Sequence, residues 1–377
     1  MSDNMTTCVV ISAGGTGGHI LPALSVTRVL EEMTDTVKTL LVCGARDIEL
    51  SIYEKEGYDP VVLPIGSRGR RFPEKVRFFV QLVKSFFQAL GLLRQVEPDV
   101  VVGMGGYCSI PVVAAAFFLR IPCVLHEQNA LPGTANKYLA KIARGVAFGF
   151  PEAQQLLPHR HSLYVGNPIR PAILESTREE GIRVYGVAED ETVILIIGGS
   201  LGAPQMNANF LRSLEQLDSS LPMGIKLRVL WSVGERTCET FRPEIDGTAL
   251  RRTQIGIFPY IENVGIAYQA ADIVVSRAGA STIAEIAACG RPSVLVPSPY
   301  VKGRHQHKNA MYMVKEGAAY LVEENDIGGQ YFLEVMKELI TDVDKRRSMA
   351  SRAKQLGKPQ AARTLAQLIM EVSQKTA

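Results

Sequence analysis

The sequence predicts an α/β fold that is built from two parallel-sheet domains. Short β-branched runs alternate with amphipathic segments of helix length along most of the 377 residues, a pattern typical of parallel sheets covered by helices. A chain of this length also exceeds one small domain. Each half opens with a strand that runs into a glycine-rich loop. We therefore expect two similar nucleotide-binding-type domains that face each other across a cleft.

The predicted strands fall into two sets, and each strand is a continuous apolar run of the kind that is buried on both faces of a sheet. They cover residues 8–12, 39–43, 100–103 and 122–125 in the first half, and 193–197, 227–231, 272–276 and 292–296 in the second. Residues 165–171 lie between the sets and contain a glycine and two prolines, which interrupt regular structure. We place the domain boundary there, giving domains of residues 1–167 and 168–357.

The composition argues against several functional classes. Because 41 Lys and Arg nearly balance 38 Asp and Glu, the net charge of +3 does not support a nucleic-acid-coating role. Six scattered cysteines without a C-x-x-C pair signal neither a disulfide framework nor a zinc cage. The longest apolar stretch, residues 112–119, is shorter than the roughly 18–20 residues that a spanning helix needs. The first residues also lack the basic region of a signal peptide. We expect no nucleic-acid partner and no membrane-spanning helix.

The first glycine loop, Gly14-Gly-Thr-Gly-Gly18, leads from a strand into a helix whose first turn should contain Pro22. Backbone N–H groups and the helix dipole at such a junction suit a phosphate. The loop is not a P-loop, since His19 stands where Lys is needed, and the third glycine of a dinucleotide motif would fall at Ile20. It is either a phosphate-binding loop of another type or a tight turn found in any α/β protein.

The second glycine loop, residues 198–203, has the same character and adds the hydroxyl of Ser200. This hydroxyl can donate to a phosphate oxygen, or it can cap the helix that Pro204 begins.

A strand, a loop and a short helix that stops at Gly290 follow in residues 276–290. Glu285 lies about one turn inside this helix. Its carboxylate can accept two hydrogen bonds from ribose hydroxyls, or it can form a capping box with Thr282. The spacing does not choose between these two roles.

Three short segments contain pairs of residues that can bind a metal ion: His159-Arg-His161, His305-Gln-His307 and Asp342-Val-Asp344. The histidine pairs have no acidic or thiol partner nearby in the sequence, so we interpret them as loop histidines. The aspartates lie near the start of a charged helix and fit a helix-end role. We expect neither a required metal nor a cofactor.

Residues 68–94 are strongly basic, with seven Lys and Arg against Glu74 alone. Apolar residues recur at helical spacing within this segment and predict one buried face: Val76, Phe79, Val80, Val83, Phe87 and Leu90. Four more widen the apolar surface beyond that face: Phe72, Phe78, Leu82 and Phe86. The segment is either an ordinary surface helix or a helix that adsorbs to an anionic membrane surface.

Seven motifs together closely resemble one enzyme family. They are Gly14–His19, Gly103–Tyr107, His126–Asn129, Gly166–Arg170, Gly198–Ser200, Ser276–Ala280 with Glu285, and Gln306 with Asn309-Ala310. The sequence is similar to the bacterial transferases that move N-acetylglucosamine from UDP-GlcNAc to undecaprenyl-pyrophosphoryl-N-acetylmuramyl-pentapeptide. The resemblance implies a GT-B fold of two Rossmann-like domains, with the lipid acceptor on residues 1–167 and UDP-GlcNAc on residues 168–357. It also implies that a helix within about residues 358–377 packs back onto the first domain.

The same resemblance implies a set of substrate-binding residues. They are Thr16, Gly17, Gly18, Asn129, Arg170, Ser200, Ile261, Ala280, Ser281, Thr282, Ile283, Ala284, Glu285 and Gln306. Ile261 would meet uracil through its backbone, Ala280 to Ala284 would line the diphosphate, and Glu285 would bind ribose. Two positions depart from the family pattern, because Leu201 and His305 stand where glutamine is usual. These departures concern individual polar contacts and leave the donor class unchanged.

The implied reaction is an inverting transfer to the carbon-4 hydroxyl of the muramyl sugar, which converts lipid I to lipid II in peptidoglycan synthesis. His19 is the candidate general base, since an imidazole can accept a proton at pH 7, and Glu127 is the reserve. The alternative roles for His19 are binding of the acceptor pyrophosphate and packing at the helix start. The expected location is the cytoplasmic face of the cell membrane. A UDP-GlcNAc epimerase and a non-catalytic UDP-sugar-binding protein are the alternative functions.

Overall fold

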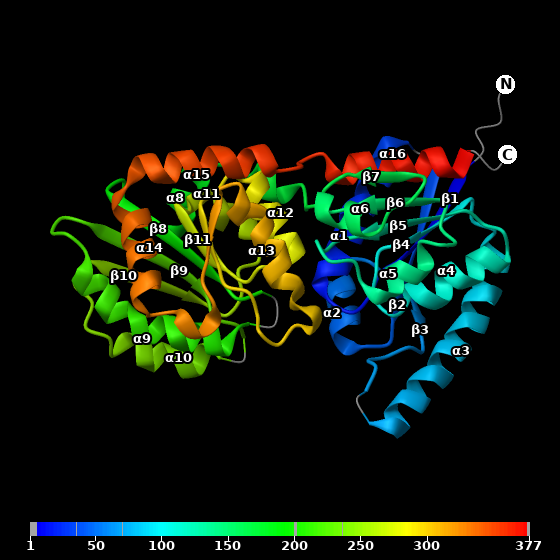
Figure 1. Ribbon diagram of the computed structural model, residues 1–377, viewed down its shortest axis with the longest axis horizontal. Coiled ribbons are helices and arrows are strands. Elements are labelled where there is room, and N and C mark those ends of the chain that lie inside the picture. Colours follow the sequence, from blue (N-terminus) through cyan, green and yellow to red (C-terminus); the bar gives the residue numbers. More distant parts are fainter. Residues whose placement is uncertain (1–5, 35, 70, 200–201, 236, 375–377) are drawn as a thin grey trace. The chain divides into compact units, whose positions relative to one another are not determined.

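The structure, a computed structural model, describes residues 6–34, 36–69, 71–199, 202–235 and 237–374 (Figure 1). The chain divides into two units. Unit 1 comprises Met1–Ile169 and Pro359–Ala377, and unit 2 comprises Arg170–Lys358. Each unit contains one sheet whose neighbouring strands are parallel and whose faces are covered by helices. The predicted α/β class with two parallel sheets is confirmed.

Unit 1 has a seven-stranded sheet with the order β3-β2-β1-β4-β5-β6-β7. The strands are β1 Thr7–Ser12, β2 Val37–Gly44, β3 Val61–Leu63, β4 Val100–Gly103, β5 Cys123–Glu127, β6 Gly145–Phe148 and β7 Ser162–Tyr164. The helices are α1 Gly17–Met33, α2 Asp47–Lys55, α3 Phe72–Val96, α4 Ser109–Phe118, α5 Thr134–Leu139, α6 Pro151–Leu156 and α16 Ala361–Gln374. Alternate residues of β1 serve opposite faces. Val9 and Ile11 pack with α1 and α16, whereas Val10 packs with α3 and α4.

Unit 2 repeats this strand order with six strands, β10-β9-β8-β11-β12-β13. They are β8 Glu191–Ile197, β9 Lys226–Ser232, β10 Thr253–Phe258, β11 Ile273–Ser276, β12 Ser293–Leu295 and β13 Ala319–Leu321. The α-helices are α7 Ala172–Glu175, α8 Arg178–Tyr185, α9 Pro204–Ser220, α10 Cys238–Asp246, α11 Val264–Ala270, α12 Ala280–Ala288, α13 His305–Lys315, α14 Gln330–Thr341 and α15 Val343–Leu356. Two 3₁₀ turns cover Lys302–Arg304 and Glu324–Asp326. The order of the first six strands is therefore the same in both units.

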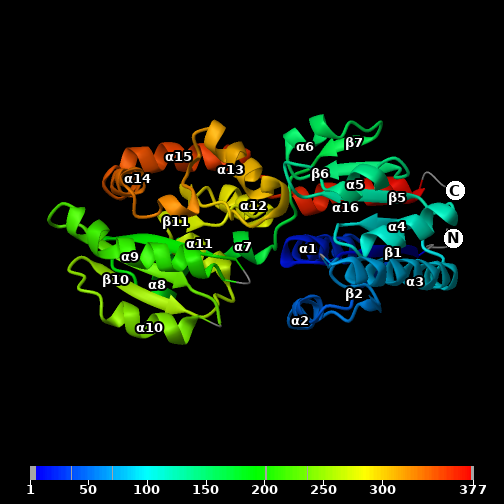
Figure 2. The same cartoon turned by 60° about the horizontal axis from the view of Figure 1, so that its bottom comes forward.

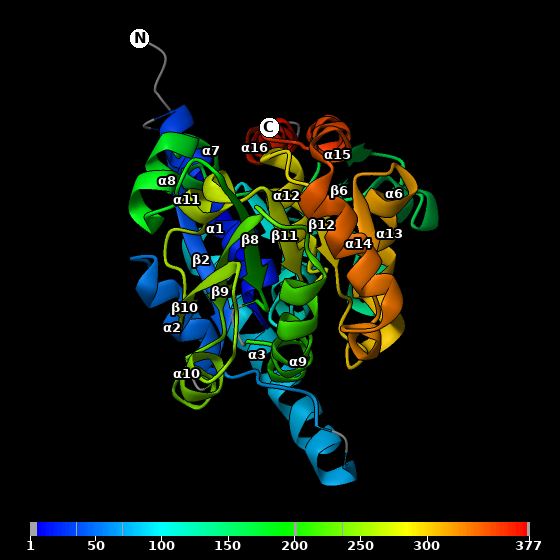
Figure 3. The ribbon, with the colours of Figure 1, turned by 90° about the vertical axis from the view of Figure 1, so that its left-hand side faces the viewer.

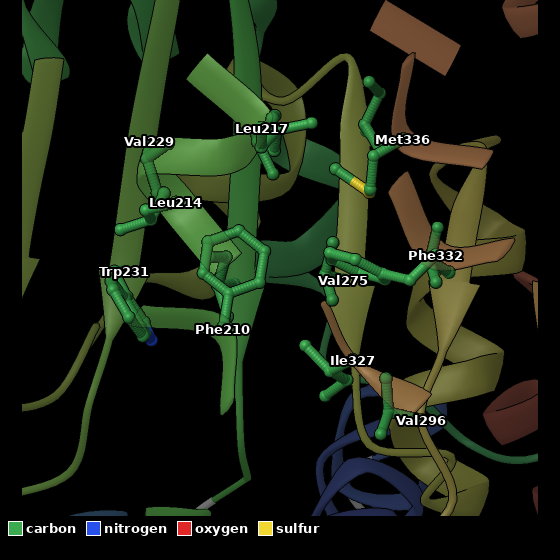
Figure 4. Packing of buried hydrophobic residues seen from close by; sticks show 14 of the residues in the cluster. Phe210, Leu214, Leu217, Val229, Trp231, Val275, Val296, Ile327, Phe332 and Met336 are labelled. Atoms are coloured by element: carbon green, nitrogen blue, oxygen red, sulfur yellow. The ribbon is translucent and has the colours of Figure 1, made fainter. Parts of the chain in front are cut away.

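The core of unit 2 contains the chain's single tryptophan, Trp231. Its ring stacks edge-on against Phe210, which in turn contacts Phe332 of α14 (Figure 4). The indole N–H donates to the side-chain oxygen of Asn207, 3.1 Å away. Because a buried indole N–H without a partner is costly, this bond makes the aromatic centre of unit 2 compatible with full burial.

Two local predictions about helices were wrong. Pro22 is the sixth residue of α1, since the helix begins at Gly17 with Thr16 as its N-cap, and so Pro22 does not lie in the first turn. Most of the predicted buried face of the basic helix is in fact exposed. Phe79 is 64% exposed and Phe87 is 63% exposed. Of the residues that we placed outside that face, Phe78, Leu82 and Phe86 pack against the core, whereas Phe72 is exposed. Leu90 of the predicted face also packs against the core.

Small residues explain the orientation of α3. Ser85, Ala89 and Leu93 are buried at a spacing of four residues, which lets the helix backbone approach the sheet. Small side chains do not stand out in a hydrophobic pattern, and so periodicity selected the wrong face. Figure 2 shows α3 and α4 side by side, and Figure 3 shows the amino-terminal turns of α3 extending beyond the rest of unit 1. The exposed apolar face runs along this helix.

Candidate substrate-binding and active site

The candidate site residues follow the carboxyl ends of the central strands in both sheets. The strand order reverses between β1 and β4 in unit 1 and between β8 and β11 in unit 2. Ligands of open α/β sheets bind at such switch points, outside the carboxyl ends of the strands. The predicted glycine loops after β1 and β8, and the loop before α12, all lie at these positions.

In unit 1 the loops after β1 and β4 touch through their backbones. The N–H of Gly14 donates to the carbonyl of Gly105 at 3.3 Å. Gly106 has φ of +81°, and a Cβ atom there would lie 2.3 Å from the carbonyl oxygen of Gly14. Only glycine fits this approach, because any side chain would push the two loops apart.

His19 lies against the same two loops. Its Nδ1 is 3.0 Å from the carbonyl oxygen of Gly14. Since a carbonyl only accepts, this contact assigns the proton to Nδ1 and leaves Nε2 as the acceptor of the neutral ring. Burial lowers the pKa of His19 below its ordinary value, although the Glu127 carboxylate and the Gly14 carbonyl act in the opposite direction. A neutral imidazole with an available lone pair suits a general base.

The carboxylate of Glu127 is occupied by hydrogen bonds. It is buried at the end of β5. It accepts from the N–H of Asn129 at 3.0 Å, the N–H of Gly133 at 2.9 Å and the side-chain amide of Asn136 at 2.8 Å. These bonds shape the loop that carries Asn129. They favour a structural role for Glu127 over that of a general base.

The first turn of α1 contains the predicted binding residues Gly17 and Gly18. Thr16 is the N-cap, but its side chain makes no capping hydrogen bond. Its exposed hydroxyl, together with the positive end of the helix, suits an anionic ligand.

In unit 2, helix α12 begins at Ala280 with Gly279 as its N-cap, directly after β11. The predicted diphosphate-binding residues Ala280 to Ala284 therefore form the first turn and the start of the second. No acidic residue occupies the first turn, so the positive end of the helix is not neutralised from within.

Glu285 contacts two polar side chains from other elements. Its Oε2 accepts a hydrogen bond from the hydroxyl of Tyr268 at 3.1 Å, and its Oε1 lies 3.6 Å from Nη2 of Arg170. The capping-box alternative was wrong, because Thr282 is the third residue of the helix rather than its N-cap. Burial raises the pKa of Glu285, and Arg170 and Tyr268 partly offset this effect. The carboxylate of Glu285 is therefore buried, and Tyr268 and Arg170 fix its position.

Gln306 and Ile261 also belong to unit 2. The side-chain oxygen of Gln306 accepts from the N–H of Ser298 at 2.8 Å, which assigns the amide orientation and leaves its NH₂ group as a donor. Ile261 is buried in the segment after β10. His305 and His307 lie in helix α13, so their interpretation as loop histidines was wrong. Ser200 and Leu201 lie outside the described residues.

Asp342 and His159, from the segments considered as possible metal ligands, form hydrogen bonds with backbone groups. Asp342 caps α15 by accepting from the N–H of Lys345 at 2.8 Å, as its predicted helix-end role requires. His159 binds the carbonyl of Ala143 at 3.2 Å and interacts with the backbone of His161. Within the residues that the structure describes, no three His, Cys, Asp or Glu side chains are grouped to hold a metal ion.

Sequence reasoning missed three residues that form hydrogen bonds with the candidate site or with the residue just before its first glycine loop: Tyr268, Arg46 and Tyr53. Tyr268 lies on α11, and its hydroxyl could be recognised only as a polar group within an apolar helix that must find a partner when buried. Arg46 and Tyr53, at the start and within α2, contact the first glycine loop. Nothing in the local sequence connects them with that loop.

Comparison with known proteins gives matches over nearly the whole chain. Residues 9–148 match the glycosyltransferase family 28 N-terminal domain and residues 193–365 match the glycosyltransferase family 28 C-terminal domain. A relative from Halothermothrix orenii is 37% identical over 97% of this chain and 99% of its own. It is named UDP-N-acetylglucosamine--N-acetylmuramyl-(pentapeptide) pyrophosphoryl-undecaprenol N-acetylglucosamine transferase.

Solved structures agree with this assignment. The crystal structure of MurG from Acinetobacter baumannii has a TM-score of 0.76 and 28% identity, and the match covers 97% of this chain and 99% of that one. UDP-GlcNAc 2-epimerase from Neisseria meningitidis, bound to UDP-GlcNAc, has a TM-score of 0.66 over 97% of this chain and 100% of that one. At 16% identity, the second match shows a shared fold only. The chain belongs to glycosyltransferase family 28, which confirms the resemblance that its motifs indicate.

Proposed function

We propose that this glycosyltransferase moves N-acetylglucosamine from UDP-GlcNAc to the carbon-4 hydroxyl of undecaprenyl-pyrophosphoryl-muramyl-pentapeptide and releases UDP. The observation that carries the proposal is the near-complete match to relatives that bear this activity as their name. The site geometry supports it, because both units place glycine-rich loops and helix starts at switch points suited to anionic ligands.

We assign the donor nucleotide to unit 2. Glu285 would accept hydrogen bonds from the ribose hydroxyls, and the start of α12 would lie against the diphosphate. Ile261 would meet the uracil through its backbone, and Arg170, Ser200 and the NH₂ group of Gln306 would add polar contacts. The hydrogen bond from Ser298 to Gln306 supports this last assignment because it orients the amide.

Unit 1 would supply the acceptor side and the base. The muramyl carbon-4 hydroxyl attacks the anomeric carbon in line and inverts its configuration, while the bond to the diphosphate breaks and UDP leaves with the bonding electrons. Nε2 of His19 takes the hydroxyl proton, which its neutral state and the Nδ1 contact with Gly14 permit. Fixed N–H donors at the helix starts stabilise the charge that develops on the diphosphate. Thr16, Gly17, Gly18 and Asn129 would contact the donor sugar and phosphates.

We also propose that unit 1 docks on the cytoplasmic face of an anionic membrane through an apolar stripe on α3 and α4. The stripe is exposed, and it comprises Phe72, Val76, Phe79, Val80, Val83, Phe87, Phe117 and Phe118. Exposed Lys75, Arg77, Lys84 and Arg94 lie on the same helix, and each cation near an anionic surface contributes about 1 kcal/mol. A lipid-linked acceptor would be reached from such a position.

Helix α3 is the one described helix that is long and apolar enough, by length and composition alone, to cross a membrane. Its packing argues for surface docking instead. Ala89 and Leu93 are buried against unit 1 and Phe86 packs on the same core, while the cations on the helix would be costly inside a bilayer.

The reaction itself is tested by incubating the purified protein with labelled UDP-GlcNAc, with and without the lipid acceptor. We expect UDP release only when the acceptor is present, and a product that contains both sugars. An epimerase would consume donor without acceptor, and a non-catalytic binding protein would turn over nothing. Either result would contradict the transferase assignment.

The His19→Ala variant should lower kcat by about 100-fold or more, while KM for UDP-GlcNAc changes little because the nucleotide is held by unit 2. His161→Ala, a change of an exposed histidine in the same unit, is the control. Since the pKa of His19 is lowered, kcat/KM of the wild-type protein should fall only below about pH 6.5, the ordinary histidine value. Unchanged turnover of the variant would remove His19 from the mechanism.

The Glu285→Gln variant should weaken UDP binding about tenfold or more, because a carboxylate accepts stronger hydrogen bonds than an amide. Calorimetric titration with UDP measures this, and Glu334→Gln on the exposed face of α14 is the control. Burial raises the pKa of Glu285 above 4.5, so wild-type affinity should fall as the pH drops toward that raised value. The variant should lack this pH dependence, and equal affinities would argue against ribose binding.

Membrane docking is tested by co-sedimentation with vesicles that contain anionic phospholipid. Replacing Phe79 and Phe87 with Asp together should reduce the bound fraction at least about tenfold, since each buried phenyl contributes roughly 1.5–3 kcal/mol. Leu156→Asp changes an apolar residue of unit 1 that is 58% exposed and lies outside the stripe, and it should have little effect. If the double variant binds as well as the wild type, the stripe is not the docking surface.

A further inference from the structure

Three successive carbonyl groups at the start of the first glycine loop, those of Ala13, Gly14 and Gly15, each accept a hydrogen bond from a side chain. The hydroxyl of Tyr53 donates to the carbonyl of Ala13 at 2.9 Å, and Nδ1 of His19 donates to that of Gly14 at 3.0 Å. Nη1 of Arg46 donates to the carbonyl of Gly15 at 2.7 Å. The next carbonyl, that of Thr16, accepts instead from the backbone N–H groups of His19 and Ile20.

Helix α2 supplies two of these three donors. Arg46 is its N-cap residue and Tyr53 lies seven positions further, with Glu49 between them. Residues spaced by three and four lie on one face of a helix, so these side chains are presented together. The carboxylate of Glu49 is buried, accepts the N–H of Gly44 at 2.8 Å and lies 3.8 Å from Nη1 of Arg46. Glu49 thereby fixes the guanidinium that binds Gly15.

Fixing the carbonyls also aims the N–H groups. The carbonyl of Gly14 shares a peptide plane with the N–H of Gly15, and the carbonyl of Gly15 shares one with the N–H of Thr16. In a trans peptide these two bonds point in opposite directions. Because the carbonyls point to the side chains of His19 and Arg46, the N–H groups point the other way. Among the described hydrogen bonds, neither Gly15 nor Thr16 uses its N–H as a donor.

We propose that Arg46 and Glu49 are positioning residues for the transfer reaction. They hold the loop so that the N–H groups of Gly15 and Thr16 are aimed in advance at an anionic substrate group, and so that His19 keeps its Nδ1 contact. Donors that are already aimed avoid reorganisation during the reaction. The effect on catalysis rests on the proposed function, whereas the effect of Arg46 on the conformation of the loop does not.

A second arginine of unit 1 provides a matched control. Arg28 pairs with Glu56 at 2.7 Å, and its side chain is 34% exposed, compared with 36% for Arg46. Arg28 lies on α1, and among the described contacts it interacts with Tyr58 and Glu56 rather than with the glycine loop. A purely structural arginine should therefore behave like Arg28.

The test compares the wild type with Arg46→Ala and Arg28→Ala in the full-length chain. Without substrate, amide hydrogen exchange of Gly14 and His19, whose N–H groups donate to the carbonyls of Gly105 and Thr16, should be about tenfold faster in R46A and unchanged in R28A. In turnover assays, R46A should lower kcat about tenfold or more, since slight misplacement of reacting groups is costly. The Kd for UDP should change less than kcat, because the residues assigned to the ribose and the uracil, Glu285 and Ile261, lie in unit 2.

Three outcomes would be decisive. If R46A and R28A exchange alike and have equal kcat, the positioning role is overturned. If exchange rises in R46A but kcat does not fall, the loop is held by Arg46 without consequence for transfer, and the proposal is also overturned. If the wild type releases no UDP with acceptor but exchange still rises in R46A, the proposed function fails while the hold on the loop is upheld.

Discussion

The backbone contact between the loops after β1 and β4 is the constraint on which the candidate site in unit 1 depends. The hydrogen bond from Gly14 to Gly105 and the close approach of Gly106 leave no room for side chains between the loops. The ring of His19 occupies the remaining space beside Gly105. The narrow backbone approach thus limits where the imidazole lies, and the carbonyl of Gly14 sets its tautomer.

Each unit places a titratable side chain at the switch point of its sheet, but the two side chains differ. Each sheet reverses its strand order beside a loop that opens a helix, and each holds a titratable side chain at that edge. In unit 1 burial keeps an imidazole neutral, which favours proton acceptance. In unit 2 Arg170 and Tyr268 partly offset the cost of burying the Glu285 carboxylate, and a carboxylate can accept hydrogen bonds from hydroxyl groups. A repeated architecture thus carries two kinds of chemistry.

The sequence allowed the fold class and the central strands to be predicted, because buried parallel strands are continuous apolar runs. It did not reveal β3, β6, β7, β10 or β13: the first, third and last of these have only three residues, and β10 includes polar residues and a glycine and is not a continuous apolar run. It also assigned most of the exposed face of α3 to the core. The glycine loops were recognisable from local residues, as was Glu285. Tyr268 and Arg46 were not, because their importance comes from contacts made across the fold with residues 17 and 31 positions away. Local patterns do not encode such contacts.

The edge-on contact between Trp231 and Phe210 has a practical consequence for spectroscopy. Because the chain has one tryptophan and it is buried in unit 2, intrinsic fluorescence excited at the indole reports the environment of that unit alone. Circular dichroism reports the helices of both units. The two signals can therefore separate the unfolding of unit 2 from that of unit 1 without any added label, and a difference between their midpoints would measure how far the two halves of the chain unfold independently.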